Sequence, residues 1–478
     1  MNLKSFLSKS ALYKNRHIIG FFFVAFMLYV FVALGFARNP IGLSELELQS
    51  LELSGSFSFP QSFINLPYHF LQWISIKIFG PSVFGVRLVS VLLGILTGGL
   101  VVVSIRNFIR NNVAILSGLI ISSSVFFLNY ARLGAPMIMS MFLLSLAIFA
   151  ISQYLTSTKH RTFWILVTVF ATIVGVYSPM GIYLLLALVL IAIFHPKVRL
   201  LIKRMKVWQT SIASVATLAL LTPLVFAIVY QPSLLLSLLG IDSLVYTPVD
   251  VWHNIQALIM PWGIDSFGLV TPFFNIVEIA LVIIGVVTLL RQSFSARSQL
   301  FLGLGALAFV VSMFDITNAY IMFIPFVFMM SFGVQTIIDK WYLLFPVNPY
   351  AKLFGLIPIG VLIFGLISSN FSQYNTSNYH NTNVIYTRNE TYQIVRNELT
   401  SLSAHSVSLV VSEADIPLYS TLKNEFPNVT IGPNSDRRSE TQIFIPSTFH
   451  QNTQIPTRVV TNGNSKDYVV LKIYQKTN

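Results

Sequence analysis

The 478-residue sequence contains no cysteine, and only 10% of its residues are charged. The absence of cysteine excludes disulfides, thiol catalysis and cysteine-ligated metals. Soluble domains usually carry about a quarter charged residues, so the chain as a whole does not have a soluble composition. Its 55% hydrophobic residues and mean hydropathy of +0.73 indicate a membrane protein.

Long apolar runs account for most of this hydrophobicity. A helix needs about 20 residues to cross ~30 Å of hydrocarbon. The sequence therefore predicts an α-helical polytopic protein of the plasma membrane with about eleven spans. The first run is too long for a signal peptide and lacks a small-residue cleavage site, so we interpret it as a retained span. The predicted spans are residues 17–37, 82–104, 112–129, 137–155, 162–178, 181–195, 209–230, 271–290, 299–314, 318–338 and 351–369.

Basic residues are distributed unevenly between the predicted loops. With a cytoplasmic N-terminus, 17 of the 21 Lys and Arg residues before the C-terminal tail fall on the cytoplasmic side. This asymmetry follows the positive-inside rule. It explains the net charge of +13 without a nucleic-acid partner, and after eleven spans it predicts an extracytoplasmic C-terminus.

Acidic residues are scarce in the membrane part, where only nine occur up to Asn370. Three of them, Glu45, Glu47 and Glu52, lie in the first predicted outer loop. Ser44 and Glu47 have the spacing of a helix capping box, so capping explains Glu47 better than catalysis does. Glu52 fits a solvated helix face. Glu45 is therefore the candidate catalytic carboxylate of this loop, and its simpler alternative is an acid in the first turn of a helix.

The composition changes at about residue 371, because residues 371–478 carry nine Lys and Arg and eight Asp and Glu. We predict two domains: a transmembrane domain over residues 1–370 and a small extracytoplasmic α/β domain over residues 371–478. Helical patterns cover Asn389–Leu402 and Ile416–Phe426. Strand-like runs cover Asn383–Tyr386, Ser406–Val411, Asn428–Ile431, Gln442–Ile445, Arg458–Thr461 and Tyr468–Tyr474.

A long outer loop over residues 231–271 has no Lys or Arg and carries Asp250 and His253. A surface helix is predicted near Val249 to Met260. Long ordered loops often bind ligands, although solvation of the loop explains Asp250 better, and a position at the membrane interface explains His253 better. No spacing of His, Asp and Glu within one element resembles a set of metal ligands.

Several short motifs, taken in order, resemble those of the GT-C glycosyltransferases. The likeness is to bacterial relatives of the protein O-mannosyltransferases and of the lipid A aminoarabinose transferase. The motifs lie in the outer loops and at the ends of the spans. The matching residues are Ser44-Glu45; Asn65-Leu66-Pro67-Tyr68-His69 with Ile78-Phe79-Gly80; Ser82, Arg87-Leu88, Ser90 and Gly94; Ala131-Arg132-Leu133-Gly134-Ala135-Pro136-Met137; and Ala319-Tyr320 with Pro325.

This resemblance implies a GT-C fold and transfer of a sugar from a polyprenyl-phosphate donor to a hydroxyl of a glycan, lipid or protein. Glu45 would be the base for the acceptor or would help to hold a divalent metal ion. Arg132 would contact the donor phosphate, and a structural alternative for it is a snorkelling interface residue. Together with the outer loops, the resemblance suggests further substrate-binding residues: Tyr68, His69, Glu47, Asp250, His253 and Tyr320.

Three positions depart from the family pattern, which has Asp, Asp and Arg where this chain has Ser44, Met137 and Ala319. Either Glu45 works with other groups, or the protein is a non-catalytic relative that binds lipid-linked glycan or scaffolds envelope assembly. A transporter is disfavoured, because the spans are almost free of charge at mid-depth and no inverted repeat is evident.

Overall fold

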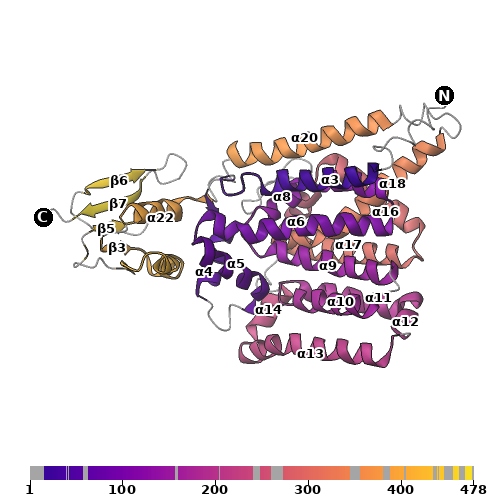
Figure 1. The fold of residues 1–478 in the computed structure, drawn as a ribbon, viewed down its shortest axis with the longest axis horizontal. Coiled ribbons are helices and arrows are strands. Elements are labelled where there is room, and N and C mark those ends of the chain that lie inside the picture. Colours follow the sequence, from indigo (N-terminus) through magenta and orange to yellow (C-terminus); the bar gives the residue numbers. More distant parts are fainter. Residues whose placement is uncertain are drawn as a thin grey trace.

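The computed structural model describes a helix bundle with a small sheet domain at one end (Figure 1). Helix α12 (Pro196–Lys203) lies at the opposite end. The described residues are 15–38, 40, 42–56, 63–156, 160–203, 205–240, 248–259, 273–344, 356–380, 388–402, 405–433, 439, 441–445, 456–461 and 469–475.

Apolar helices build the bundle, and seven in the described ranges are long and apolar enough to cross a membrane. They are α3 (Arg16–Leu28) continued by the π-helical turn η1 (Tyr29–Ala33), α6 (Val83–Phe108), α9 (Met137–Thr156), α13 (Val207–Tyr230), α17 (Ala296–Phe314), the 3-10 helix η3 (Ile316–Met322) with α18 (Phe323–Leu344), and α20 (Leu356–His380).

The remaining predicted spans are matched by a bent helix pair and three shorter helices. The pair α7 (Asn111–Ser123) and α8 (Val125–Ala131) bends by 63° at Ser124. Helices α10 (Arg161–Gly175), α11 (Gly181–Phe194) and α16 (Ile276–Arg291) are shorter. The predicted polytopic helical fold is therefore confirmed.

Small residues let two of these helices approach each other closely. A Cβ atom at Gly285 of α16 would overlap the Met329 carbonyl of α18, and one at Gly333 of α18 would overlap the Leu281 carbonyl of α16. Glycine at both positions therefore sets the spacing of this pair, as is common between membrane helices.

Two further helices, α4 (Glu45–Ser56) and α5 (Leu66–Phe79), lie between the bundle and the sheet domain (Figure 1). The start of α5 follows Asn65 in the left-handed region at φ 56°, and Pro67 lies in its first turn. The helices α14 (Ser233–Leu239) and α15 (Pro248–Ile259) lie within the long loop over residues 231–271, and α15 matches the predicted surface helix.

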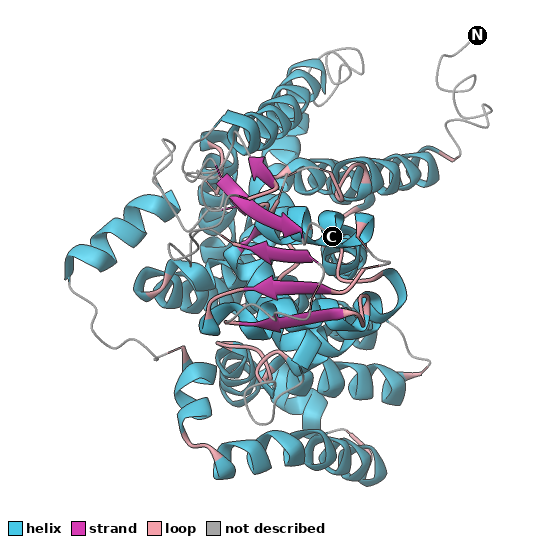
Figure 2. Cartoon of the chain, turned by 90° about the vertical axis from the view of Figure 1, so that its left-hand side faces the viewer, coloured by secondary structure: helices cyan, strands magenta, loops and turns pink. Residues whose placement is uncertain are grey.

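The C-terminal part contains the predicted small sheet, which faces the viewer in Figure 2. Its strand order is β4-β3-β5-β7-β6, with β3 parallel to β4 and β5, and β7 antiparallel to β5 and β6. The predicted strand over 383–386 lies outside the described residues. The elements are β2 (Arg388–Asn389), α22 (Thr391–Ser401), β3 (Val407–Val410), η4 (Glu413–Asp415), α23 (Ile416–Ser420), η5 (Thr421–Asn424), β4 (Val429–Gly432), β5 (Thr441–Phe444), β6 (Arg458–Thr461) and β7 (Val469–Gln475).

The sheet domain and the first outer loop share one hydrophobic core. Leu51 of α4, Ile76 of α5 and Val86 of α6 pack in the same cluster as Tyr392 and Leu409 of the sheet domain. In addition, β1 (Leu43–Ser44) pairs antiparallel with β2. Helix α20 runs past residue 370 to its end at His380. The first outer loop is thus held between the bundle and the C-terminal part.

Candidate functional site

A buried ion pair between Arg87 and Glu47 lies where the first outer loop meets α6. Both side chains are 0% exposed, and Arg87 Nε lies 2.6 Å from Glu47 Oε1. Arg87 Nη2 donates to Glu47 Oε2 at 3.0 Å. The guanidinium also donates to the carbonyls of Phe36, Pro40 and Gly42, at 3.2, 2.7 and 2.6 Å. Arg87 therefore fixes the path of the chain that leads into α4.

Glu47 joins three of the motif segments. Ser44 N–H donates to Glu47 Oε2 at 2.8 Å and Glu47 N–H donates to Ser44 Oγ at 3.3 Å, which confirms the predicted capping box. The Gly134 N–H donates to Glu47 Oε1 at 2.9 Å and brings in the turn after α8. Such complete bonding offsets the large cost of removing both charges from water. A side chain at Gly134 would overlap Val86, so this approach requires glycine.

A second buried network surrounds Gln72 of α5. Its Nε2 donates to the carbonyls of Val86 and Gly134, both at 3.1 Å. Its Oε1 accepts from the hydroxyls of Ser50 and Ser54 at 2.7 and 2.5 Å. Because the amide nitrogen faces two carbonyls, its oxygen must face the hydroxyls, and both serines act as donors. The network therefore ties α4, α5, α6 and the turn at Gly134 together.

The same hydrogen bonds select one tautomer of His69. Its Nδ1 lies 3.1 Å from Ser54 Oγ, whose only proton is donated to Gln72. Nδ1 must therefore carry the proton and donate it, which leaves Nε2 as the basic nitrogen. Burial lowers the pKa of His69 to about 4, so the ring is neutral near pH 7. The neighbouring Tyr68 is also buried and shares a 2.7 Å hydrogen bond with Ser90, and burial raises its pKa.

Glu45 and Arg132, the principal candidates from the sequence, have opposite environments. Glu45 is exposed in the first turn of α4, two residues before the buried Glu47. Arg132 is only 4% exposed, donates from Nη2 to the Leu34 carbonyl, and lies 5.7 Å above the Tyr374 ring. Its Nε is buried and has no hydrogen-bond partner in the described part of the chain. Arg132 thus retains one buried N–H donor for a further acceptor.

The other predicted residues lie on η3 and α15. Tyr320 is buried, and its hydroxyl donates to the Pro179 carbonyl at 3.0 Å. His253 is exposed on α15, whereas the side chain of Asp250 lies outside the described residues. Helix α15 packs on α17 and η3. The structure therefore gathers Glu47, Tyr68 and His69 around α5 and leaves Tyr320 and His253 on separate elements.

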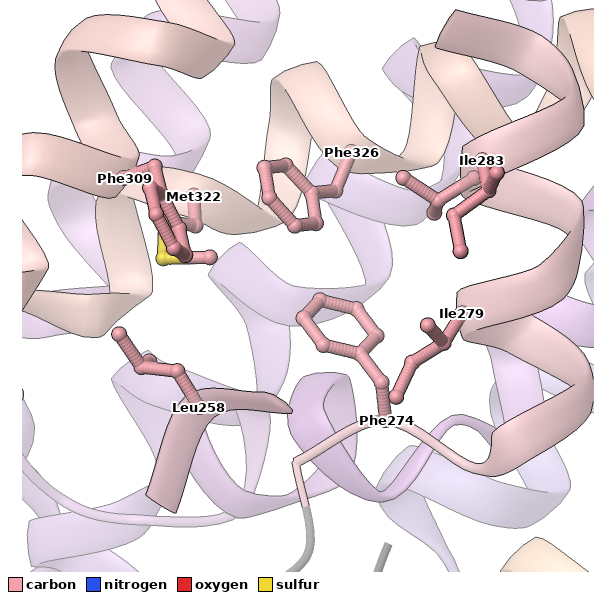
Figure 3. A pocket seen from close by; sticks show the side chains of 8 residues that line it. Leu258, Phe274, Ile279, Ile283, Phe309, Met322 and Phe326 are labelled. Carbon is pink, nitrogen blue, oxygen red and sulfur yellow. The ribbon is translucent and has the colours of Figure 1, made fainter. Parts of the chain in front are cut away.

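An apolar pocket of about 230 Å³ opens between α15, α16, α17, η3 and α18 (Figure 3). The Phe274 and Phe326 rings stack at 5.5 Å in its wall. Both rings also line a smaller neighbouring pocket that reaches Glu278. Glu278 is buried and accepts from Asn370 Nδ2 at 2.9 Å. The full lining of this apolar pocket is Leu258, Phe274, Ile279, Val282, Ile283, Phe309, Met322 and Phe326.

The described residues contain no group of three or more His, Asp or Glu side chains that could hold a metal ion. Sequence reasoning missed Ser50, Ser54, Gln72 and the role of Gly134. The spacing in the sequence could have indicated these residues. Ser50 and Ser54 are four residues apart, and His69 and Gln72 are three residues apart, so each pair lies on one face of its helix.

Comparisons with known proteins agree with this architecture. The sequence family described as dolichyl-phosphate-mannose-protein mannosyltransferase matches residues 66–226. A curated protein of Aquifex aeolicus (strain VF5), described as uncharacterized, is 33% identical over 109 residues, which are 23% of this chain and 22% of the relative. The match thus spans less than a quarter of that relative's length.

Two solved structures are similar over nearly the whole chain. The crystal structure of ArnT from Cupriavidus metallidurans bound to undecaprenyl phosphate has a TM-score of 0.57 at 12% identity, covering 97% of this chain and 98% of that one. The oligosaccharyltransferase of Archaeoglobus fulgidus has a TM-score of 0.54 at 11% identity, covering 90% and 66%. The protein is therefore a multi-pass membrane protein with the GT-C fold. The family match covers residues 66–226, and the similarity to the GT-C fold extends over nearly the whole chain.

Proposed function

We propose that the protein transfers a sugar from a polyprenyl-phosphate donor to a hydroxyl of an envelope glycan, a lipid or a protein. Glu45 takes the proton of the acceptor hydroxyl, whose oxygen then bonds to the anomeric carbon. The bond between that carbon and the phosphate oxygen breaks, and polyprenyl phosphate leaves with the electron pair. Arg132 stabilises the negative charge of the departing phosphate.

The observation that carries this proposal is the joining of three motif segments by Glu47 and Arg87. It holds the start of α4, which bears Glu45, to the turn that follows Arg132. Two comparisons support a lipid phosphate ligand: the crystal structure of ArnT contains undecaprenyl phosphate, and a structure of the archaeal oligosaccharyltransferase is a complex with an inhibitory peptide and a dolichol-phosphate. The apolar pocket supplies a surface for part of an isoprenoid chain.

The proposal includes an orientation. The N-terminus faces the cytoplasm, and the transfer occurs on the outer side, where the C-terminal sheet follows α20. The basic residues of the predicted inner loops support this orientation. Helices α4 and α5 lie at the end of the bundle that carries the sheet domain, and α12 lies at the other end (Figure 1).

The test is transfer by purified protein in liposomes, with a radiolabelled polyprenyl-phosphate sugar and envelope extract as acceptor. The lipid that co-purifies with the protein is identified by mass spectrometry and guides the choice of donor. We expect incorporation of label by the wild type. Arg132→Gln should raise the KM for the donor roughly tenfold, because one charged hydrogen bond to phosphate is lost. The exposed Arg38→Gln is the control.

A non-catalytic role is the second candidate function. It is favoured by Ser44, Met137 and Ala319, which cannot replace the acidic and basic groups of the family pattern. In that case the wild type would retain a lipid-linked glycan through purification but would show no transfer to any acceptor. Absence of both the bound lipid and the transfer would contradict both functions.

A further inference from the structure

A dense basic segment lies at α12 and the turn that follows it. Residues 195–206 contain five Lys or Arg residues, and no Asp or Glu occurs between Glu52 and Asp242. The side chains of Arg199, Lys203 and Lys206 are exposed. The positive charge of this segment is therefore not balanced by acidic residues nearby in the sequence.

Exposed apolar side chains flank these cations. Phe194, Val207 and Trp208 are 73%, 82% and 50% exposed at the ends of α11 and α13. Apolar and aromatic side chains beside Lys and Arg are typical of the boundary between hydrocarbon and headgroups. Asp339, on α18, already forms an ion pair with Arg110 at 2.9 Å. The surface is thus positive, amphipathic and open.

We propose that α12 with the turn to Lys206 forms a binding surface for anionic phospholipid headgroups. We call this surface, defined by Arg199, Lys203 and Lys206 with Phe194 and Trp208, the basic collar. Its cations attract the phosphate charge, and its flanking apolar groups meet the acyl chains of the same lipids. The collar lies at the end of the bundle remote from α4, α5 and the sheet domain, and it binds lipid whether or not sugar transfer occurs (Figure 1).

The test compares lipids retained by the protein in nanodiscs made of equal parts phosphatidylglycerol and phosphatidylcholine, measured by native mass spectrometry. The wild type should retain phosphatidylglycerol in excess. The triple variant Arg199→Gln/Lys203→Gln/Lys206→Gln should lower that excess roughly tenfold, since each cation near a membrane surface contributes to the attraction. The control Arg291→Gln/Lys340→Gln removes two other exposed cations, near the C-terminal ends of α16 and α18, and should keep the excess.

Equal losses in both variants, or no loss in the triple variant, would overturn the proposal. If the triple variant does not fold, the wild type is labelled in the same nanodiscs with a photoreactive phosphatidylglycerol. Crosslinks concentrated at residues 194–208 and reduced at high salt support the basic collar. Crosslinks spread evenly over the helix ends contradict it.

Discussion

Two regions of the molecule show opposite ways of building a site. The polar junction, formed by Glu47, Arg87, Gln72, His69 and Ser54, is buried and fully connected by directional hydrogen bonds. The apolar pocket between α15 and α18 contains almost no polar surface. Directional bonds fix one geometry, whereas an apolar wall accepts a chain in many positions. We infer that the junction positions reacting groups and the pocket accommodates a lipid.

The largest effect is expected from breaking the junction at its ion pair. Arg87→Met leaves Glu47 charged and buried, which costs about 3–5 kcal/mol of folding stability. The change is measured by thermal unfolding in detergent, in which the readout is the fraction of protein that stays monodisperse after heating. Adding Glu47→Leu to Arg87→Met should recover part of the loss, because no charge then remains buried.

The control for this variant is the ion pair between Arg110 and Asp339, whose side chains are 63% and 37% exposed. Arg110→Met should cost at most about 1 kcal/mol, since exposed pairs contribute little. Equal destabilisation by Arg87→Met and Arg110→Met would mean that the buried ion pair contributes no more to folding stability than the exposed ion pair.

The next largest effect concerns pH. Burial lowers the pKa of His69 from its ordinary 6.5 to about 4 in the folded protein, so between these pH values the unfolded chain binds a proton that the folded chain does not. The free energy of unfolding is therefore unaffected by His69 above pH 6.5. It decreases as the pH falls from 6.5 toward 4, by on the order of 3 kcal/mol, because the unfolded chain takes up the proton first. His69→Gln should remove this part of the pH dependence of thermal unfolding. His253→Gln, on the exposed face of α15, is the control for loss of a histidine.

A smaller effect, on binding rather than folding, should follow from filling the apolar pocket. Ile283 points into it, as Figure 3 shows, and Ile283→Trp occupies space that a lipid chain would use. We expect the KM for the donor to rise roughly tenfold with kcat unchanged, the result of lost uniform binding. Val287→Trp, one turn further along α16, adds the same side chain outside the lining. If both variants transfer sugar with wild-type KM, the lipid does not use this pocket.

The smallest effect is expected where α4 meets the sheet domain. Burial and the charge of Asp415 raise the pKa of Glu52. A raised carboxyl pKa means that the charged form is disfavoured on folding, so Glu52→Gln should stabilise this contact above that pKa, by less than about 1 kcal/mol. The gain should vanish as the pH falls and Glu52 takes up its proton. Hydrogen exchange of α4 measures the change, and a loss of protection at neutral pH contradicts the expectation.

The fold could be largely predicted from the sequence because membrane spans and alternating strands leave strong local patterns. Every predicted span has a helix, and the Ser44–Glu47 capping box is local and was also predicted. Several boundaries differ: the helix predicted over 416–426 ends at Ser420 and continues as a 3-10 turn, and the span predicted over 351–369 continues to His380. Helix ends are set by tertiary packing, which a local pattern does not contain.

The site was less predictable, because its contacts join distant segments. Arg87 is part of a motif recognised in the sequence, but its pairing with Glu47 depends on how α6 and α4 pack, as do the bonds from Gln72 to Val86 and Gly134. His69 was assigned to substrate binding, and its burial against Ser54 emerges only in three dimensions. The roles of Glu45 and Arg132 stay predictions.

In the proposed mechanism, the buried Glu47 positions the exposed Glu45 for proton transfer. The most direct measurement is the rate of sugar transfer by Glu45→Gln in liposomes, with Glu52→Gln as the matched carboxylate on the same helix. We predict that Glu45→Gln loses at least about 100-fold in rate, as expected for removal of a general base, with unchanged unfolding temperature and retained lipid. Transfer at the wild-type rate by Glu45→Gln would contradict the account.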